Sequence, residues 1–485
     1  MFEQLSEFLS KEGWLNTQLT LIKDFLWDWN WHSIIVVLVF CGIYFTIRTK
    51  FVQFRMIPEM IKLLGESVPK NKKKHHVSSF QAFAVSVATR VGTGNLAGVA
   101  GAIAVGGPGA VFWMWVIALI GSATAFVEST LAQLFKRKHE GWFIGGPAYY
   151  ILHGLHSPWM ASLFAVLLTL TFGLSYNSIQ SNTIAEALHT AFNFDPAIVG
   201  VVLSTLALVI VFGGLHRIAK FSSVIVPVMA IGYFILAFVI VVMNYDKIPE
   251  VMSLIVKSAF GFGPAAGGVL GAALSNGIKR GLFSNEAGEG SAPNVAATAT
   301  VSHPVKQGLI QALGVFTDTL LVCSCTAFII LLSGVYATGA QEGIALTQNA
   351  LETQIGSSGH IFVAIAILFF AFSSIIGNYY YGEANILFLT RRKWILTVFR
   401  FLSGGVMVMI GTLASLDVVW SFGEICMAIL TLCNLIAILL LGKYAFRLLK
   451  DNRTQKKNGI KSPVFNRSKF PEISKDLDAW GPDDV

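Results

Sequence analysis

Charged side chains are scarce in this sequence. Asp, Glu, Lys and Arg make up only 13% of the 485 residues, whereas 54% of the residues are hydrophobic, and the mean hydropathy is +0.65. Soluble domains carry about 25% charged residues, so the composition excludes an ordinary soluble fold. The ten histidines form no H-x-x-E-H-like or Ser-His grouping, which argues against common metalloprotease and hydrolase chemistry.

Cysteine is also rare, and its spacing does not indicate a metal site. A structural metal site needs paired cysteines with a second pair or with histidines, and no such partner accompanies the one Cys-x-Cys pair. All five cysteines fall inside apolar runs, where we expect them to pack as small apolar side chains: Cys41, Cys323, Cys325, Cys426 and Cys433.

The first 32 residues lack a basic region followed by a short apolar core and a small-residue cleavage site, so we expect no removable signal peptide. Residues 1–32 instead mix Leu, Phe and Trp with Glu, Lys and Asp. This mixture suits an amphipathic segment lying on the extracytoplasmic surface of a membrane. A plain tether is the equal alternative.

Long apolar runs are the main feature that is present. A helix that spans a bilayer needs roughly 20 mainly apolar residues, which leaves room for about eleven such helices in this chain. We predict spans at residues 33–48, 80–105, 109–135, 158–178, 196–213, 219–243, 264–288, 306–333, 360–390, 396–414 and 418–446. The sequence therefore predicts an all-α integral membrane protein.

Lys and Arg alternate between the connections of these spans, and short cytoplasmic loops carry such an excess. The basic connections are residues 48–76, 136–138, 217–220, 306 and 391–393, together with the tail after Lys443. An odd number of spans then places the N-terminus outside and the C-terminus in the cytoplasm. The formal net charge of +8 thus reflects membrane topology, and we expect no nucleic-acid partner.

Two similar sequence segments interrupt the apolar runs, at residues 90–102 and 280–292. Five positions match between them: Arg90 with Arg280, Asn95 with Asn285, Ala97 with Ala287, Gly98 with Gly288, and Ala102 with Ala292. A pair of glycine-interrupted hydrophobic segments in two halves points to the binding site of a secondary transporter built from inverted repeats. The pattern therefore predicts a carrier with two broken helices.

Glycine lowers helix propensity, so residues 91–95 can unwind and expose backbone N–H groups where a half-helix begins. Such N–H groups attract a carboxylate, and carbonyls freed on the other side can coordinate Na⁺. The alternative is that these glycines only allow close packing of helices. The duplication and the adjoining polar residues favour the binding site.

The segments at residues 89–104, 145–150 and 280–293 resemble the alanine or glycine:cation symporter family, of the sodium:alanine symporter type, over nearly the whole chain. Residues 91–95 are also similar to the first broken helix of the neurotransmitter:sodium symporters. The resemblance implies the amino acid-polyamine-cation superfamily fold, a five-plus-five inverted repeat with one extra N-terminal helix. It divides the chain into an extracytoplasmic segment (1–32), the extra helix (33–48), a basic cytoplasmic loop (49–77), a first repeat (78–243), a connection (244–263), a second repeat (264–446) and a cytoplasmic tail (447–485).

The resemblance also implies the site residues. The substrate carboxylate would meet backbone N–H groups of Thr93, Gly94 and Asn95. Other positions resemble the family's substrate cavity: Ala97, Phe172, Leu274, Ser275, Asn276 and Asn378. The sodium ligands would be the carbonyls of Ala88, Val91 and Phe370 with the hydroxyls of Ser373 and Ser374, since a small hard cation needs hard oxygen ligands. Without the resemblance, a Ser-Ser pair in an apolar helix more often bonds back to its own carbonyls.

Two positions depart from the small-substrate members of that family. Ala97 stands where those members often carry Gln, and Asn378 stands where they often carry Trp. The exchange enlarges the cavity and adds an amide that both donates and accepts hydrogen bonds. We therefore expect glutamine as the substrate. If other side chains refill the space, alanine or glycine remains the substrate.

Ionisable residues inside spans default to a functional role with a partner. We expect a cytoplasmic gate that involves Arg90, Lys279, Arg280 and Glu289, where Glu289 replaces a commonly apolar residue. The acids available to neutralise the bases are Glu128, Glu286, Glu289, Asp318 and Glu383. Alternatively, Lys279 and Arg280 extend to the cytoplasmic interface without a gating role.

The predicted function is sodium-coupled uptake of an amino acid by alternating access, with H⁺ as the alternative coupling ion. Na⁺ stabilises the conformer that holds substrate, and substrate reciprocally tightens Na⁺ binding. No covalent chemistry is needed, so we expect no enzyme. A channel lacks support because no filter-type repeat occurs, and an amino-acid sensor is the alternative from another class. We expect a multi-pass protein of a bacterial-type plasma membrane.

Overall fold

The computed structural model describes residues 14–27, 34–66, 77–139, 141–261, 266–339 and 343–481. Parts of the predicted N-terminal segment (1–13 and 28–32), the basic run at 67–76 and the end of the 244–263 connection lie outside the described residues. The described chain is almost wholly helical. Two short strands in it, β1 (Arg137–His139) and β2 (Trp142–Ile144), pair antiparallel, with Arg137 opposite Ile144.

The helices run in chain order without a further sheet. The first part contains α2 (Trp14–Trp27), α3 (Ile34–Arg48), α4 (Val52–Arg55), α5 (Ile57–Leu64), α6 (Ser79–Arg90), η2 (Gly94–Gly98), α7 (Val99–Gly106), α8 (Gly109–Leu134), α9 (Pro147–Gly154), α10 (Pro158–Leu170), η3 (Thr171–Tyr176), α11 (Asn177–Phe192), α12 (Pro196–Val211), α13 (Gly214–Met243) and η4 (Tyr245–Lys247). The second part contains α14 (Ile248–Ala259), α15 (Ala266–Asn285), α16 (Ala292–Ala296), α17 (Val305–Val315), η5 (Phe316–Cys323), α18 (Ser324–Ser333), η6 (Val335–Thr338), α19 (Gly343–Ile355), α20 (Ser358–Leu389), α21 (Lys393–Phe401), η7 (Leu402–Val406), α22 (Met407–Leu413), α23 (Leu416–Lys457), η8 (Arg467–Lys469) and η9 (Ser474–Asp476).

Local signals explain where several helices begin. Ser78 caps α6 by accepting from the Gln81 amide at 3.1 Å, while the Gln81 side chain accepts from the Ser78 amide at 2.9 Å. This reciprocal pair is a capping box. Asp195 caps α12 by accepting from the Ala197 amide. Pro196 occupies the first helical position, where a missing N–H group costs no hydrogen bond.

The described residues include seven helical stretches that are long and apolar enough to cross a membrane: Gly109–Leu134, Pro158–Phe192, Lys220–Met243, Val305–Ser333, Ser358–Leu389, Lys393–Leu413 and Leu416–Lys457. Shorter apolar helices occupy Ile34–Arg48, Gly94–Gly106 and Pro196–Val211. The seven are fewer than the eleven spans predicted, partly because the broken helices are divided into pieces below spanning length. The architecture is that of an all-α membrane protein.

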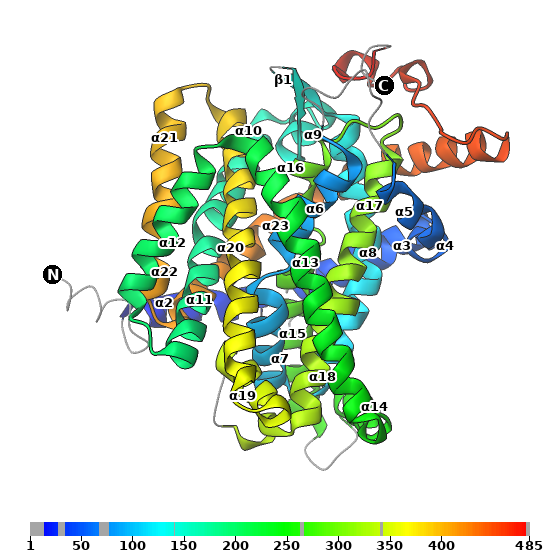
Figure 1. The fold of residues 1–485 in the computed structure, drawn as a ribbon. Helices are drawn as coiled ribbons and strands as arrows, with labels where there is room; N and C mark the ends of the chain where they lie inside the picture. Colours follow the sequence, from blue (N-terminus) through cyan, green and yellow to red (C-terminus); the bar gives the residue numbers. More distant parts are fainter. Residues whose placement is uncertain are drawn as a thin grey trace.

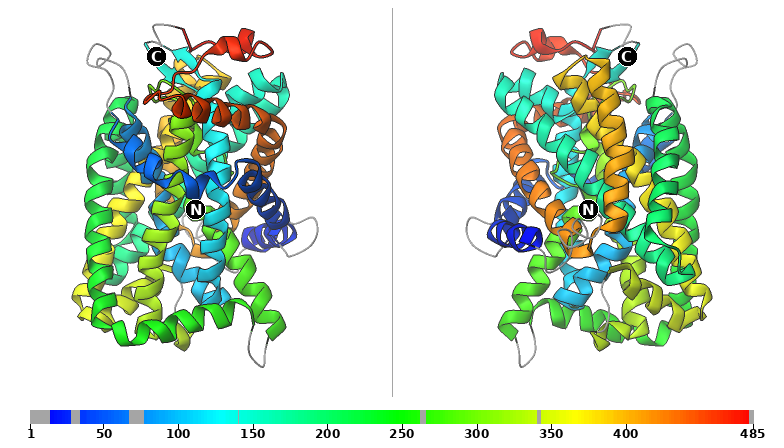
Figure 2. Two further views of the ribbon diagram at one scale, coloured as in Figure 1. Left: turned by 90° about the vertical axis from the view of Figure 1, so that its right-hand side faces the viewer. Right: turned by 90° about the vertical axis from the view of Figure 1, so that its left-hand side faces the viewer.

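The broken helices occupy the middle of the bundle. Figure 1 shows α6 above α7 and α16 above α15, enclosed by α8, α13, α17 and α20. The two side views show the light-blue α7 inside the bundle (Figure 2). Both breaks therefore lie about halfway between the two ends of the bundle.

The two ends differ in what they carry. The β-hairpin, α9 and the described tail lie at the upper end in Figure 1, whereas α14 and α19 lie at the lower end. The upper end thus carries Arg137 and Lys138, from a basic connection that was predicted to be cytoplasmic. The side of the membrane that this end faces stays a prediction.

The described part of the tail after α23 packs on the bundle. The Phe465 amide donates to the Ser302 carbonyl at 2.8 Å, and Trp480 Nε1 donates to the Leu134 carbonyl at 3.0 Å. The buried apolar side chains of the tail include Phe465, Phe470, Ile473, Leu477 and Trp480. The sequence showed no helical periodicity here because these residues anchor an irregular segment.

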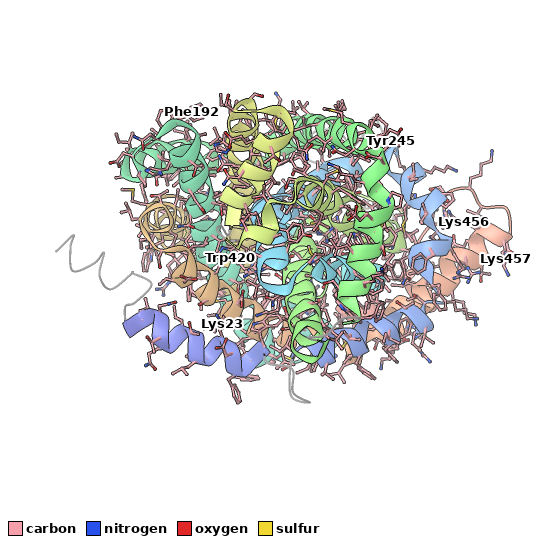
Figure 3. The ribbon with its side chains drawn as sticks, turned by 90° about the horizontal axis from the view of Figure 1, so that it is seen from below. Lys23, Phe192, Tyr245, Trp420, Lys456 and Lys457 are labelled. Carbon is pink, nitrogen blue, oxygen red and sulfur yellow. The ribbon has the colours of Figure 1, made fainter. Side chains whose placement is uncertain are left out.

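Helix α2 lies along the side of the bundle between its two ends (Figure 1). Trp27 is 1% exposed, and its Nε1 donates to the Glu424 carbonyl of α23 at 3.1 Å. Leu21 and Phe25 point outward and are exposed. Seen from below, Lys23 of α2 lies nearer the rim than Trp420 of α23 (Figure 3).

Candidate functional site

The first broken helix is interrupted where the sequence predicted unwinding. Helix α6 ends at Arg90, and Val91 is extended, with φ −81° and ψ 91°. A Cβ on Gly92 would lie 2.4 Å from Ser374 Oγ and 2.7 Å from Gln180 Oε1, so no larger residue fits without displacing those side chains. The backbone at Gly92 therefore packs directly against polar side chains of α20 and α11.

The second break lies later in residues 280–292 than the alignment with residues 90–102 predicts. Arg280 matches Arg90, yet α15 continues past Arg280 to Asn285. The chain then turns through positive φ at Glu286 (56°), Gly288 (99°) and Gly290 (79°). Gly281 serves close packing instead, because a Cβ there would lie 2.5 Å from Ile117.

The five predicted sodium ligands meet across α6 and α20. Ser374 Oγ lies 2.8 Å from the Ala88 carbonyl oxygen, 3.5 Å from that of Val91 and 3.0 Å from that of Phe370. Ser373 Oγ donates to the Phe370 carbonyl at 2.8 Å. Both serines thus also make the back-bonds expected of hydroxyls in an apolar helix. The donor set consists of carbonyl and hydroxyl oxygens, which suit Na⁺.

The backbone N–H group predicted to bind a carboxylate already has an oxygen partner. Gln180 Oε1 accepts from the Thr93 amide at 2.9 Å and from the Thr93 hydroxyl at 2.8 Å. The Gly92 amide donates to Asn95 Oδ1 at 2.9 Å. Gln180 was absent from the predicted residues, since a polar residue in a helix gives no sign of which face it occupies. Its oxygen stands where one carboxylate oxygen was expected.

A buried carboxylate joins the two broken helices. Asp318 is fully buried and accepts from Asn95 Nδ2 at 2.7 Å and from Ser284 Oγ at 2.8 Å. Thr319 Oγ1 adds a third donor at 2.8 Å. The sequence identified Asp318 only as an acid that could neutralise a basic residue. In the structure it fixes the position of Asn95 relative to α15.

Asn378 is buried next to the proposed ion ligands and has no partner. The side chain is 1% exposed, and neither Nδ2 nor Oδ1 has a hydrogen-bond partner within the described chain. Asn378 follows Ser374 by one helical turn of α20, so both occupy one face. Ala97, the other departure from the small-substrate pattern, is also buried, in η2. A buried amide without partners is costly unless a ligand pairs with it.

Phe172 belongs to an aromatic wall rather than to an isolated contact. Its ring centroid lies 4.6 Å from that of Tyr176 and 5.4 Å from that of Tyr381. The row continues from Tyr176 to Phe283 at 4.8 Å and from Phe283 to Trp420 at 4.7 Å. The wall connects η3 and α20 with α15 and α23.

The structure does not bring Leu274, Ser275 and Asn276 to the break. They lie more than two turns of α15 before its end at Asn285, and Asn276 Nδ2 bonds back to the Ala272 carbonyl at 3.0 Å. Ser284 takes the position closest to the first break, because its Cα would lie 3.0 Å from a Cβ on Gly94. Because the turn after α15 comes late in residues 280–292, the contact with the first break is made by the end of that helix.

Lys279 and Arg280 pair with an acid that the sequence did not single out. Lys279 Nζ lies 3.5 Å and Arg280 Nη2 lies 3.0 Å from carboxylate oxygens of Glu424 in α23. The Arg280 guanidinium also lies 3.9 Å from the Trp420 ring centroid. Both bases are on the lower half-helix, α15, away from the basic loops (Figure 1). Both bases therefore have a counter-charge inside the bundle, and a gating role for them stays a prediction.

Arg90 and Glu289 do not join that pair. Arg90 is 1% exposed, and its Nη1 donates to the Gln311 carbonyl at 3.3 Å. Its Nε and Nη2 have no hydrogen-bond partner among the residues described. Glu289 accepts from the Tyr176 hydroxyl at 3.2 Å. Lys279 and Arg280 thus share Glu424, whereas Arg90 and Glu289 each contact other residues.

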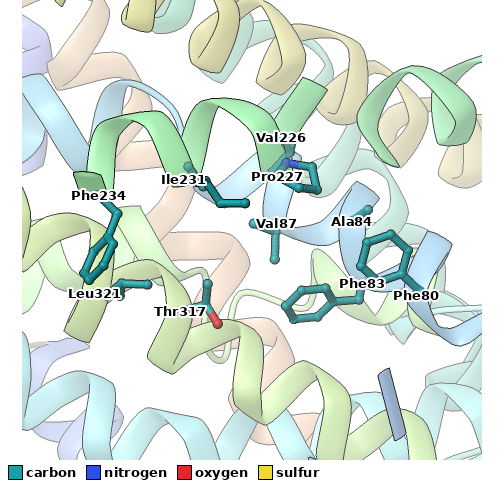
Figure 4. A pocket seen from close by; sticks show the side chains of 11 residues that line it. Phe80, Phe83, Ala84, Val87, Val226, Pro227, Ile231, Phe234, Thr317 and Leu321 are labelled. Atoms are coloured by element: carbon teal, nitrogen blue, oxygen red, sulfur yellow. The ribbon is translucent and has the colours of Figure 1, made fainter. Parts of the chain in front are cut away.

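An apolar hollow of about 270 Å³ lies between α6, α13 and η5. Its lining includes Phe80, Phe83, Ile231 and Phe234, with Thr317 as the one polar residue (Figure 4). A zwitterion needs charged or hydrogen-bonding partners, which this lining does not supply. The break at residues 91–93, with its polar contacts, is the better candidate for the functional site.

Known proteins resemble this chain over nearly its whole length. It is 53% identical over 447 residues to "Probable sodium/glutamine symporter GlnT" of Bacillus subtilis (strain 168), which covers 92% of each chain. It is 48% identical over 469 residues to "Amino-acid carrier protein AlsT" of the same organism, with 97% of this chain and 98% of that one covered. The "Sodium/proton-dependent alanine carrier protein" of Bacillus sp. (strain PS3) is 40% identical over 410 residues, covering 81% of this chain and 92% of that one.

The sequence model of the sodium:alanine symporter family matches residues 12–467. This match confirms the resemblance that the broken-helix motifs indicated. It also removes the channel, sensor and enzyme alternatives, because the family consists of symporters. Na⁺ is the co-transported ion, with H⁺ as the alternative that the alanine carrier's name includes. The chain therefore belongs to the sodium:alanine symporter family.

Proposed function

We propose that this symporter takes up glutamine together with Na⁺. The observation that carries the proposal is the Asn378 amide, which is buried and unpartnered on the same face of α20 as Ser374. A glutamine side-chain amide offers both a donor and an acceptor, so it can satisfy both ends of Asn378. The GlnT protein of Bacillus subtilis, named as a probable sodium/glutamine symporter, is 53% identical to this chain.

The polar groups of glutamine fit the proposed arrangement. The α-carboxylate would replace Gln180 at the Thr93 amide, while the side-chain amide would pair with Asn378. Alanine has no side-chain donor or acceptor. It would leave the buried amide unpaired, at a cost of about 1–3 kcal/mol.

Alanine is the second candidate, and one comparison favours it. The alanine carrier of Bacillus sp. (strain PS3) is 40% identical to this chain. If neighbouring side chains close around Asn378 when substrate binds, the extra space disappears and a small amino acid fits. Both substrates would be transported with the same sodium site. They differ in whether they would fill the space beside Asn378 and Ala97.

The proposed sodium site couples ion and substrate through the first broken helix. Ala88 and Val91 would bind Na⁺ through their carbonyls, just before the Thr93 amide that would bind the carboxylate. Na⁺ would hold residues 88–91 against Ser373 and Ser374, and the binding of each solute would favour the conformer that holds the other. At 100 mV, one Na⁺ moving inward contributes about 2.3 kcal/mol, which can drive accumulation of a zwitterion.

The architecture that we propose is an eleven-span bundle with a five-plus-five inverted repeat and an external N-terminus. The central position of both breaks supports a binding site near the bilayer midplane. The pair between Arg280 and Glu424 lies on the half of the bundle away from the basic loops. It would therefore hold α15 to α23 on the outer side, and its separation would accompany opening to the outside.

Uptake competition in proteoliposomes tests the substrate. Labelled L-glutamine is supplied under an inward Na⁺ gradient, with unlabelled L-alanine, glycine or L-glutamine as competitors. The proposal predicts strong inhibition by unlabelled glutamine and weak inhibition by the two smaller amino acids. Equal inhibition by alanine would make the chain a carrier of small amino acids, and uptake without any need for Na⁺ would remove the assigned ion site.

A further inference from the structure

A second hollow lies at the end of α3, far from the proposed transport site. Its volume is about 420 Å³. It is lined by residues from the end of α3 and from one side of α23: Arg48, Thr49, Lys50, Phe446, Leu449, Lys450, Arg453, Thr454 and Lys457. Five of these nine residues are Lys or Arg, and none is acidic.

The helix register of α23 creates this cluster. Phe446, Lys450, Arg453 and Lys457 are spaced by four, three and four residues, so they occupy one face of the helix. Figure 3 shows Lys457 with Lys456 at the edge of the molecule, at the end of α23. The basic side chains on this face of α23 therefore lie opposite the end of α3.

The turn after α3 holds the opposite wall in place. Lys50 and Phe51 adopt left-handed conformations, with φ of 57° and 58°. The Phe51 amide donates to the Thr46 carbonyl at 2.8 Å, and Arg55 Nη2 donates to the Thr49 carbonyl at 3.3 Å. The Arg48 guanidinium lies 5.1 Å from the Phe446 ring centroid, which links the two walls by a cation–π contact.

The neighbouring acids are engaged elsewhere. Glu59 pairs with Lys456, Asp451 with Lys469, and Glu472 with Arg447. No ion pair involves any of the five lining bases within the part of the chain that is described. Burial, followed by the charge of Arg453, lowers the pKa of the adjacent Arg55. The positive charges of the cluster therefore repel one another without a protein counter-charge.

An apolar stripe on α3 leads to the same hollow. Val36, Phe40, Ile43 and Ile47 are exposed and spaced by four, three and four residues, so they form one outward face of α3. In a membrane protein such a face contacts acyl chains. The stripe ends at Arg48, where the basic lining begins.

We propose that this hollow binds the phosphate headgroup of an anionic phospholipid, whose acyl chains lie along the stripe of α3. Five unpaired bases supply the charge that a phosphodiester needs, and the hydroxyl of Thr454 adds a hydrogen-bond donor. Phe446 and Leu449 contact the glycerol end of the lipid. Basic pockets between membrane helices on the cytoplasmic side recognise anionic headgroups by this combination of features. A soluble phosphate would use the charges but not the apolar lining.

Thermal unfolding of the purified full-length protein in a mild detergent tests the proposal. Phosphatidylglycerol, phosphatidylcholine and inorganic phosphate are added separately at equal concentrations, and the unfolding midpoint is followed by tryptophan fluorescence. We expect a rise with phosphatidylglycerol alone, because a ligand that binds the folded state stabilises it. An equal rise with phosphatidylcholine or with inorganic phosphate overturns the proposal.

The variant Lys450→Gln/Arg453→Gln supplies the residue-level test. Each base near an anionic lipid contributes a factor of about five, so the pair should weaken phosphatidylglycerol binding roughly 30-fold and remove its shift. The matched control is Arg391→Gln/Arg392→Gln, which removes two exposed bases from another basic loop and should retain the shift. An equal loss in the control, or a retained shift in the first variant, overturns the proposal. If the first variant does not fold, Lys457→Gln, at the last residue of α23, replaces it and should lose about fivefold in affinity.

Discussion

The side chain of Gln180 holds the Thr93 backbone by two hydrogen bonds, from the amide at 2.9 Å and from the hydroxyl at 2.8 Å, both to Gln180 Oε1. These are the contacts that one oxygen of a substrate carboxylate would make. Gln180 thus links α11 to the break in the first helix. Substrate entry would require this neutral oxygen to give way to a charged one, which forms the stronger hydrogen bonds.

The substitution Gln180→Glu should therefore impair substrate binding. A carboxylate at this position makes stronger hydrogen bonds than the amide and repels the substrate carboxylate, so the KM for glutamine should rise roughly tenfold or more. The measurement is the concentration dependence of uptake under a fixed Na⁺ gradient. Gln354→Glu, on α19 and away from the break, is the control, and an unchanged KM in Gln180→Glu would show that the carboxylate binds elsewhere.

Removing the Ser374 hydroxyl should weaken sodium binding. Ser374→Ala eliminates the oxygen that meets the Ala88 carbonyl at 2.8 Å. The Na⁺ concentration for half-maximal uptake should rise about tenfold, as expected for one lost polar ligand. The apparent glutamine affinity should fall in parallel, since the coupling is reciprocal.

Ser86→Ala is the matched control for this experiment. Ser86 is also buried, but its hydroxyl donates at 2.9 Å to the Phe83 carbonyl of its own helix. Its loss should leave the sodium dependence unchanged. Equal sodium dependence in Ser374→Ala and the native protein would contradict the assigned ion site.

Neutralising Glu424 should destabilise the fold. Glu424→Gln leaves Lys279 and Arg280 largely buried without their counter-charge, and breaking a buried pair in this way costs about 3–5 kcal/mol. The unfolding midpoint in detergent should fall clearly, whereas Glu250→Gln, at an exposed residue of α14, should change little. A variant as stable as the native protein would show that the pair does not stabilise the folded state.

Acid should loosen the tail from the bundle. Burial lowers the pKa of His303 below its ordinary value near 6.5. The neutral ring accepts from the Val305 amide at 3.2 Å and faces Asp451 with Nε2 at 3.5 Å. Because the folded pKa is the lower one, this stabilisation is present above about pH 6.5 and is lost as the pH falls below that value.

Limited proteolysis detects this change. Trypsin sites at Lys461 and Arg467, which flank the docked Phe465, should be cut faster at about pH 5.5 than at about pH 7.5, relative to a control protein. His303→Asn should remove most of the difference, because an amide does not titrate. Cleavage that depends on pH as strongly in His303→Asn as in the native protein would assign the effect to another group.

The sequence predicted the parts of the site that depend on local signals. The glycines around Gly92 marked the break, whereas Ser373, Ser374 and the carbonyls of Ala88 and Val91 were assigned from the family resemblance. The structure brings them within hydrogen-bond distance. The family resemblance supplied what the glycine pattern alone did not, namely which distant helix meets the break.

The partners that come from distant segments were not predictable in the same way. Gln180, Asp318 and Glu424 are polar residues in long helices, and only tertiary packing decides which residue each one meets. Leu274, Ser275 and Asn276 were assigned to the cavity because they resemble positions that line it in the family. The positive φ values at Glu286, Gly288 and Gly290 place the second break later, and Ser284 takes the central position instead.

The central claim is that Asn378 selects glutamine in a sodium-driven symporter, and one measurement tests it most directly. Uptake of labelled L-glutamine and L-alanine into proteoliposomes is compared for the native protein and Asn378→Trp, with and without an inward Na⁺ gradient. The account predicts that the native protein accumulates glutamine only with the gradient, and that Asn378→Trp loses glutamine uptake while alanine uptake survives or rises. Glutamine uptake that persists in Asn378→Trp, or a native protein that prefers alanine, would contradict it.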